Sequence, residues 1–144
     1  MTIAVAGILI GVVVPPFQAM VRRGEMADTA NDMTMAITFA RSEAARVGGG
    51  VQMQAVDAAD TANEWGPGWQ VVAPGGTVLQ RFAGAKVGMS INGTDGVAAI
   101  TFNGRGLPNQ NLTIDMCHPG TGLRIAMSAV GRPATTHLTE GDCP

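Results

Sequence analysis

The N-terminal segment constrains the fold most, because residues 1–21 contain no charged side chain. The run from Ile3 to Val14 is almost wholly apolar. A bilayer core takes about 20 apolar residues as a helix, and this run reaches Pro15-Pro16 before that length. A membrane helix that lacks its first residues fits better than a cleaved signal peptide, which needs an early Lys or Arg. A buried core helix fits the length but is unusual at the end of a small domain.

We assign the apolar residues of this segment to a helix that lies in a membrane or in the core of a filament. They are Ile3, Val5, Ile8, Leu9, Ile10, Val12, Val13, Val14, Pro15, Pro16 and Phe17. Proline removes helical hydrogen bonds and clashes with the preceding turn, so we expect a kink or local unwinding at the two prolines. Arg22 and Arg23 follow where the chain would leave the apolar phase and meet lipid headgroups or water.

A second helical stretch continues to about residue 47 with a single apolar stripe. Its residues recur at spacings of four and three: Met26, Ala30, Met33, Ile37, Ala40, Ala44 and Val47. This period predicts a helix that packs one face on a core. The three glycines at 48–50 are a strong stop signal. Arg41, Glu43 and Arg46 lie off the stripe, and their spacing does not let Arg41 face Glu43. We interpret them as a solvated helix face, with bonds to the sheet or to a neighbouring subunit as the alternative.

Beyond residue 50 the pattern changes to short strands linked by turns. We predict strands over 51–56, 68–73, 77–82, 86–91, 97–102, 112–116 and 123–130, with a surface loop over 57–66. Asn92 to Gly96 has the composition of a hairpin connection into the next strand. One long helix followed by many strands predicts an α+β fold with antiparallel sheets. Residues 1–21 form the membrane or filament half of the helix, and 22–144 form a globular head.

Composition argues against several functional classes. The net charge of −2 lacks the overall positive field of a nucleic-acid binder. The sequence contains no convergent polar motif, so we expect no catalytic, cofactor or small-molecule site. The two histidines, His118 and His137, could form a zinc set only together with Cys117 and Cys143, but Cys117 and His118 are adjacent and lack the usual spacing of zinc ligands. We expect Trp65 and Trp69 to pack on a sheet face in preference to stacking on a ligand.

The two cysteines, Cys117 and Cys143, are an even count in a chain with an export-type start. Such a count favours a single disulfide in an oxidising compartment. The alternative is a pair of unrelated thiols. A bridge would stabilise the fold by roughly 3 kcal/mol in the chain-entropy model.

Five short motifs, taken in order, resemble the GspH/FimT family of type IV pilin-like proteins. They are the apolar run into Pro15-Pro16-Phe17, the segment 40–46 (ARSEAAR), Trp65 with Gly68-Trp69, the segment 102–106 (FNGRG), and Met116-Cys117 followed by the segment 128–132 (SAVGR). Each motif is weak alone, but their order across nearly the whole chain is fairly specific.

The resemblance implies a non-enzymatic subunit, either a minor pilin of a type IV pilus or a minor pseudopilin of a type II secretion system. Family members are made as prepilins and held in the bacterial inner membrane by a single helix, with the head in the periplasm. They are processed by prepilin peptidase and added at or near the filament tip. The implied partners are other pilins or pseudopilins and the membrane.

This chain departs from the family pattern in two places. The leader, the cleavage site and the Glu that follows it are absent, so we expect that the start was assigned too late or that the chain is truncated. Some pilus members carry a Gly-Arg-x-Arg motif linked to DNA uptake, and here Gly131 and Arg132 match while Ala134 replaces the second Arg. A DNA-binding minor pilin with contacts from Arg124 and Arg132 is therefore the less favoured alternative.

Overall fold

The computed structural model describes the backbone of residues 2–139 and 141–143, and the side chains of the first helix from Phe17 onward. The elements, in chain order, are α1 (Thr2–Val47), β1 (Gly49–Ala55), β2 (Gly68–Val72), β3 (Val78–Ala83), β4 (Ser90–Gly93), the short 3-10 helix η1 (Thr94–Gly96), β5 (Ala99–Asn103), β6 (Leu112–His118), β7 (Thr121–Met127) and β8 (Pro133–Leu138).

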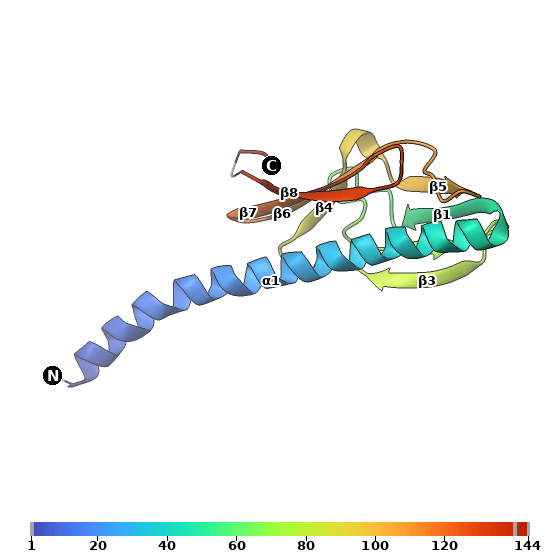
Figure 1. The fold of residues 1–144 in the computed structure, drawn as a ribbon. Helices are drawn as coiled ribbons and strands as arrows, with labels where there is room; N and C mark the ends of the chain where they lie inside the picture. The colour runs from blue at the N-terminus through green and yellow to red at the C-terminus, as the bar shows by residue number, and fades with distance from the viewer. Residues whose placement is uncertain (1, 140, 144) are drawn as a thin grey trace.

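The strands form two antiparallel sheets of four strands each. Sheet A has the order β3-β2-β1-β5, and sheet B has the order β4-β6-β7-β8. Both sheets pack on the C-terminal half of α1, while the N-terminal half extends away from the head (Figure 1). The predicted α+β fold with one long helix and antiparallel sheets is therefore confirmed.

The predicted apolar stripe of α1 forms the side of the helix that contacts the sheets. Six of its seven residues are buried, namely Met26, Ala30, Met33, Ile37, Ala40 and Ala44. The small alanines near the C-terminal end let β1 approach the helix closely. Val47 was also predicted to lie on the stripe, but it is 43% exposed because the helix ends there and the chain turns into β1.

The glycines after α1 do more than end the helix, because two of them belong to β1. Gly48, Gly49 and Gly50 all have positive φ angles, which favour glycine. A Cβ atom on Gly49 would lie 2.7 Å from the backbone nitrogen of Gly104. The sequence Gly48-Gly49-Gly50 therefore allows both the sharp reversal and the close pairing of β1 with the end of β5.

The proline pair does not interrupt α1, which is helical from Thr2 to Val47. The local unwinding that we allowed for at Pro15-Pro16 is absent, and the bend takes the form of a gradual curve in the N-terminal part of the ribbon (Figure 1). Long helices are rarely straight and commonly show gentle curvature of this kind.

The sequence placed one strand wrongly, misassigned one connection and missed one strand. Residues 86–89 form a turn, and the strand begins only at Ser90. The segment 92–96 is not a hairpin connection, because β4 pairs with β6 in sheet B whereas β5 pairs with β1 in sheet A. It is instead the crossing between sheets. The missed strand is β8, which pairs with β7 and forms one edge of sheet B.

The loop over 57–66 is exposed at its start, but its end is buried against β4. The Asn63 side-chain oxygen accepts a hydrogen bond from the backbone N–H of Ile91 at 2.8 Å. The backbone N–H of Trp65 donates to the Ile91 carbonyl at 3.1 Å. A carboxylate oxygen of the buried Glu64 accepts from the Gly93 N–H. The loop thus covers an edge of sheet B that would otherwise present unpaired backbone groups.

We expect the Asn63→Ala substitution to lower the free energy of unfolding by about 1–2 kcal/mol, because it leaves the Ile91 N–H without its partner. Urea unfolding followed by the fluorescence of the two buried tryptophans measures this loss. Asn92→Ala is the matched control, because the Asn92 side-chain oxygen has no hydrogen-bond partner among the described residues. An equal loss in both variants would contradict the role given to Asn63.

Candidate functional site

The first exposed surface is the part of α1 that extends beyond the head. Phe17 is 66% exposed and Met20 is 73% exposed, and the first buried residue among the described side chains of the helix is Met26. Apolar side chains left uncovered in this way mark a surface for another molecule. The other predicted helix residues, Ile3 to Pro16, lie outside the side chains that the structure describes. Within the described part of the chain, no helix has the length and hydropathy needed to span a membrane.

A second feature joins α1 to both sheets through Arg41. Its guanidinium donates hydrogen bonds to two backbone carbonyls, that of Gly106 through Nε at 2.9 Å and that of Gly131. Gly106 follows β5 of sheet A, and Gly131 lies in the turn between β7 and β8 of sheet B. One cation therefore links the helix to a loop from each sheet.

The two glycines are needed for this arrangement. Gly131 has a φ of 74°, and a Cβ atom there would lie 2.9 Å from Arg41 Nε. Gly106 also has a positive φ angle and packs against the Arg41 backbone. Three of the motifs noted in the sequence thus converge in space, although they lie far apart along the chain.

The sequence favoured a solvated helix face for Arg41 and its neighbours, with bonds to the sheet as the alternative, and for Arg41 the alternative is correct. The solvated face is correct for Arg46, whose guanidinium donates to Glu43 at 2.7 and 2.9 Å on the surface. The pair lowers the pKa of Glu43, first through this hydrogen bond. The signal for Arg41 was the recurrence of glycine in two separate motifs, which marks positions where a backbone comes close to another group.

The predicted disulfide between Cys117 and Cys143 is present, with a Cα–Cα distance of 5.6 Å. It lies on the outer face of sheet B and holds the C-terminal segment against β6 and β7. A Cβ atom on Gly122 would lie 2.6 Å from the Cys143 sulfur, so this segment packs directly on the β7 backbone. Since both thiols are joined, neither is free for the zinc set considered above.

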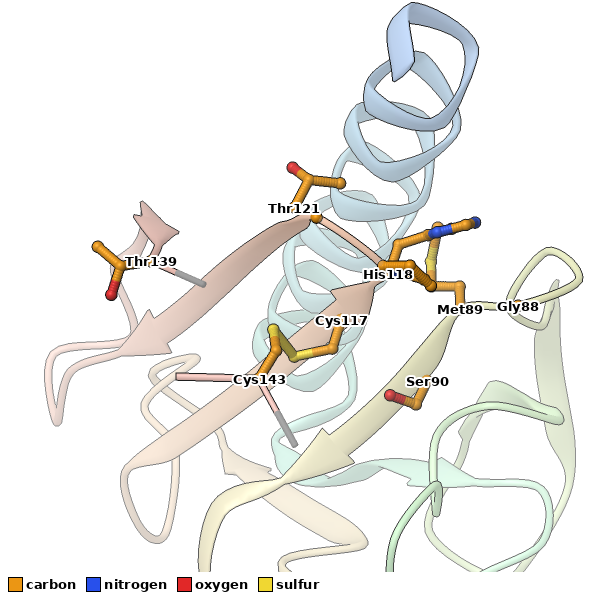
Figure 2. A pocket seen from close by; sticks show the side chains of 10 residues that line it. Gly88, Met89, Ser90, Cys117, His118, Thr121, Thr139 and Cys143 are labelled. Carbon is orange, nitrogen blue, oxygen red and sulfur yellow. A yellow bond between two sulfur atoms is a disulfide. The ribbon is translucent and has the colours of Figure 1, made fainter. Parts of the chain in front are cut away.

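An open pocket lies beside the disulfide at the end of sheet B that faces the N-terminal part of α1 (Figure 2). Ser90, His118, Thr121 and Thr139 surround it together with the disulfide. Asp142 closes the C-terminal turn, because its carboxylate accepts hydrogen bonds from the Thr139 hydroxyl at 2.6 Å and the Thr139 N–H at 3.0 Å.

These bonds from Thr139, hydroxyl first, lower the pKa of Asp142 below its ordinary value of about 3.9. A carboxyl whose pKa is lower in the folded state stabilises the fold above its unfolded pKa, and the effect is lost as the pH falls through the folded pKa. We therefore expect the C-terminal turn to loosen only below about pH 4. Titration of the Asp142 carboxyl by NMR measures this, and Thr139→Ala should return the pKa toward its ordinary value.

The two arginines proposed as weak DNA contacts both lie at sheet B, but in different settings. Arg124 on β7 forms a two-pronged ion pair with Asp115 on β6, at 2.6 and 2.8 Å. This pairing raises the pKa of Arg124, first through the hydrogen bond to Asp115, and it occupies two of the guanidinium nitrogens that could otherwise donate to a phosphate. Arg132 is exposed in the turn before β8 and borders an open pocket with Thr113 and Ala134. DNA contact by this pair stays a prediction.

The two tryptophans are buried in the core, as expected for packing residues. Trp65 also donates its Nε1–H to the Val97 carbonyl at 2.9 Å, and Trp69 stacks on Phe82 with ring centroids 6.1 Å apart. Among the described residues, no group of His, Cys, Asp and Glu is arranged to hold a metal ion.

The chain is similar to known proteins both in its sequence and in its fold. A sequence profile of the family described as "Type II transport protein GspH" matches residues 29–131. The fold is similar to that of the type IV minor pilin FimU from Pseudomonas aeruginosa in two crystal forms. The first has a TM-score of 0.66 and 22% identity over 87% of this chain and 96% of that chain. The second has a TM-score of 0.61 and 22% identity over 82% and 96%. The comparison with curated proteins returns no match.

Proposed function

Because the chain belongs to the GspH family of type II transport proteins, we propose that it is a minor pilin or minor pseudopilin. In this role it is a non-enzymatic structural subunit that joins other pilin-like subunits at or near the tip of a filament. Before assembly, α1 holds it in the bacterial inner membrane, and the head lies in the periplasm.

The division of α1 into two halves carries the proposal. From Met26 onward, one face of the helix is covered by the sheets. Phe17, Met20 and Val21 are exposed and apolar, which is unfavourable for a helix that ends in water. Packing this half against the helices of neighbouring subunits, or in lipid before assembly, removes that apolar surface from water.

The disulfide supports the periplasmic location, because such bonds persist in oxidising compartments and are rare in the cytosol. The choice between a type IV pilus and a type II secretion pseudopilus depends on the neighbouring genes. Pilus-tip and adhesin genes would favour the pilus, and general secretion genes would favour the pseudopilus. The DNA upstream of the Met1 codon decides whether a prepilin leader precedes this sequence.

Photo-crosslinking in cells tests the proposed assembly. A crosslinking amino acid at Met20 is expected to form adducts with other pilin-like subunits, because this side chain lies on the uncovered half of α1. The matched control is the same amino acid at Arg81, which is exposed on β3 at the outside of the head. Adducts at neither position in a strain that assembles filaments, or adducts only with unrelated proteins, would contradict the proposal.

A further inference from the structure

A tight turn presents one apolar and one cationic residue at the end of the head nearest the uncovered half of α1. The Met89 N–H donates to the Lys86 carbonyl at 3.0 Å, and Gly88 has a φ of 82°. This geometry places Val87 at the corner of a β-turn. Val87 is 99% exposed, more than any other large hydrophobic residue among those described. We call residues 86–88 the basal turn.

A series of contacts joins the basal turn to α1. Gly88 lies next to the His118 ring, since a Cβ atom on Gly88 would be 3.6 Å from two ring atoms. His118 ends β6, and the following residue, Pro119, accepts a hydrogen bond from Arg22 through its carbonyl at 3.3 Å. Figure 2 shows Gly88, His118 and Thr121 at the same end of the sheet, where α1 continues toward its N-terminus.

The chemistry of this end is that of a surface that rests on a membrane. Arg22, Arg23 and Lys86 supply positive charge, and Val87 and Met20 supply exposed apolar groups. Basic and apolar side chains together are typical of segments that lie at an anionic lipid surface. The nearest carboxylates on the helix, Glu25 and Asp28, follow Arg23 on the side toward the head, so they lie farther from the lipid.

We propose that the basal turn is a second membrane contact, in which Val87 enters the headgroup region of the lipid and Lys86 binds anionic headgroups. The contact fixes the tilt of the head relative to the membrane before the subunit enters a filament. This inference rests on the proposed function, because α1 must first bring the head to the lipid. The occupant is an anionic lipid surface, as the charge of the turn and its continuity with the apolar helix indicate.

Fluorescent labelling of the full chain in vesicles tests this contact. Since the two native cysteines are joined in a disulfide, a single new cysteine can be labelled with an NBD probe in each of Val87→Cys, Val130→Cys and Phe17→Cys. Val130 is the matched control, because it is also an exposed valine, at 65%. Val130 lies in the β7–β8 turn, which Arg41 binds through the Gly131 carbonyl. Arg41 is 19 residues from Arg22 along α1, so the two arginines are roughly 28 Å apart and Val130 lies far from the basal turn.

In vesicles of phosphatidylethanolamine and phosphatidylglycerol, we expect the probe at position 87 to be protected from iodide while the probe at 130 stays accessible. In phosphatidylcholine vesicles the protection at 87 should fall. Adding Lys86→Ala to the labelled chain should weaken the protected state about fivefold, the effect of losing one basic residue near the surface.

Equal accessibility at 87 and 130, with the probe at 17 protected, would overturn the second contact and leave membrane anchoring intact. Accessibility at all three positions would remove both the contact and the proposed anchoring. Protection at 87 that depends on protein concentration and not on lipid charge would assign the basal turn to another subunit and overturn the proposal.

Discussion

Arg41→Ala is expected to lower the free energy of unfolding by about 3–4 kcal/mol. The guanidinium donates to the carbonyls of Gly106 and Gly131, and hydrogen bonds to charged groups contribute roughly 1.5–3 kcal/mol each. The substitution also separates the helix from a loop of each sheet. Urea unfolding followed by the fluorescence of the buried Trp65 and Trp69 measures the loss.

Arg46→Ala is the matched control, because Arg46 pairs only with Glu43 on the helix surface. Exposed ion pairs of this kind contribute little to stability, so we expect Arg46→Ala to leave the free energy of unfolding nearly unchanged. Arg41→Lys should recover part of the stability, since an ammonium can reach one carbonyl but lacks the planar fork that bonds both. If Arg41→Ala and Arg46→Ala lower the free energy of unfolding by the same amount, Arg41 does not join the helix to the sheets.

Removal of the disulfide by a Cys117→Ser, Cys143→Ser double substitution is expected to cost roughly 3.5 kcal/mol. The two residues are 26 apart in sequence, and closing a loop of that size restricts the unfolded chain by about this amount. Reduction of the native protein should give the same loss, and both can be measured by urea unfolding with and without reductant.

Thr139→Ala separates the effect of the bridge from that of the local hydrogen bonds in the C-terminal turn. It removes the bond from the Thr139 hydroxyl to Asp142 and leaves the backbone N–H bond and the disulfide intact. We therefore expect a loss of stability much smaller than that caused by removing the bridge. A reduced protein as stable as the oxidised one would contradict the structural role of the bridge.

Much of the fold could be predicted from local patterns. The four-and-three spacing from Met26 to Ala44 identifies the buried face of α1, because a helix turns once in about 3.6 residues. Most strands between Gly49 and Met127 follow from alternation and turn residues, and β4 is the exception because its start was placed four residues too early. The disulfide follows from the even cysteine count in a chain with an export-type start.

The remaining features depend on contacts that no local pattern records. β8 begins at a proline and consists of small polar and apolar residues, so it lacks alternation; pairing with β7 fixes it as a strand. The turn at Gly93–Gly96 resembles a hairpin locally, and only the partners of β4 and β5 reveal a crossing between sheets. The segment 57–66 has the polar composition of a surface loop, yet Glu64 near its end is buried.

The role of Arg41 could not be predicted for a related reason. Its acceptors are backbone carbonyls 65 and 90 residues away, which any residue type can supply. The sequence records only the glycines that make room for the guanidinium. Residue motifs therefore predicted the class of protein better than they predicted which contacts hold the head on its helix.

The central claim is that the uncovered half of α1 assembles this subunit into a filament. The most direct test is quantitative mass spectrometry of sheared, purified filaments from cells that express the wild-type chain or Met20→Asp. We predict that the wild-type chain is present in low amount and that the variant is absent from filaments, although its head remains folded and disulfide-bonded. Absence of the stable wild-type chain from filaments, or equal incorporation of the variant, would contradict the claim.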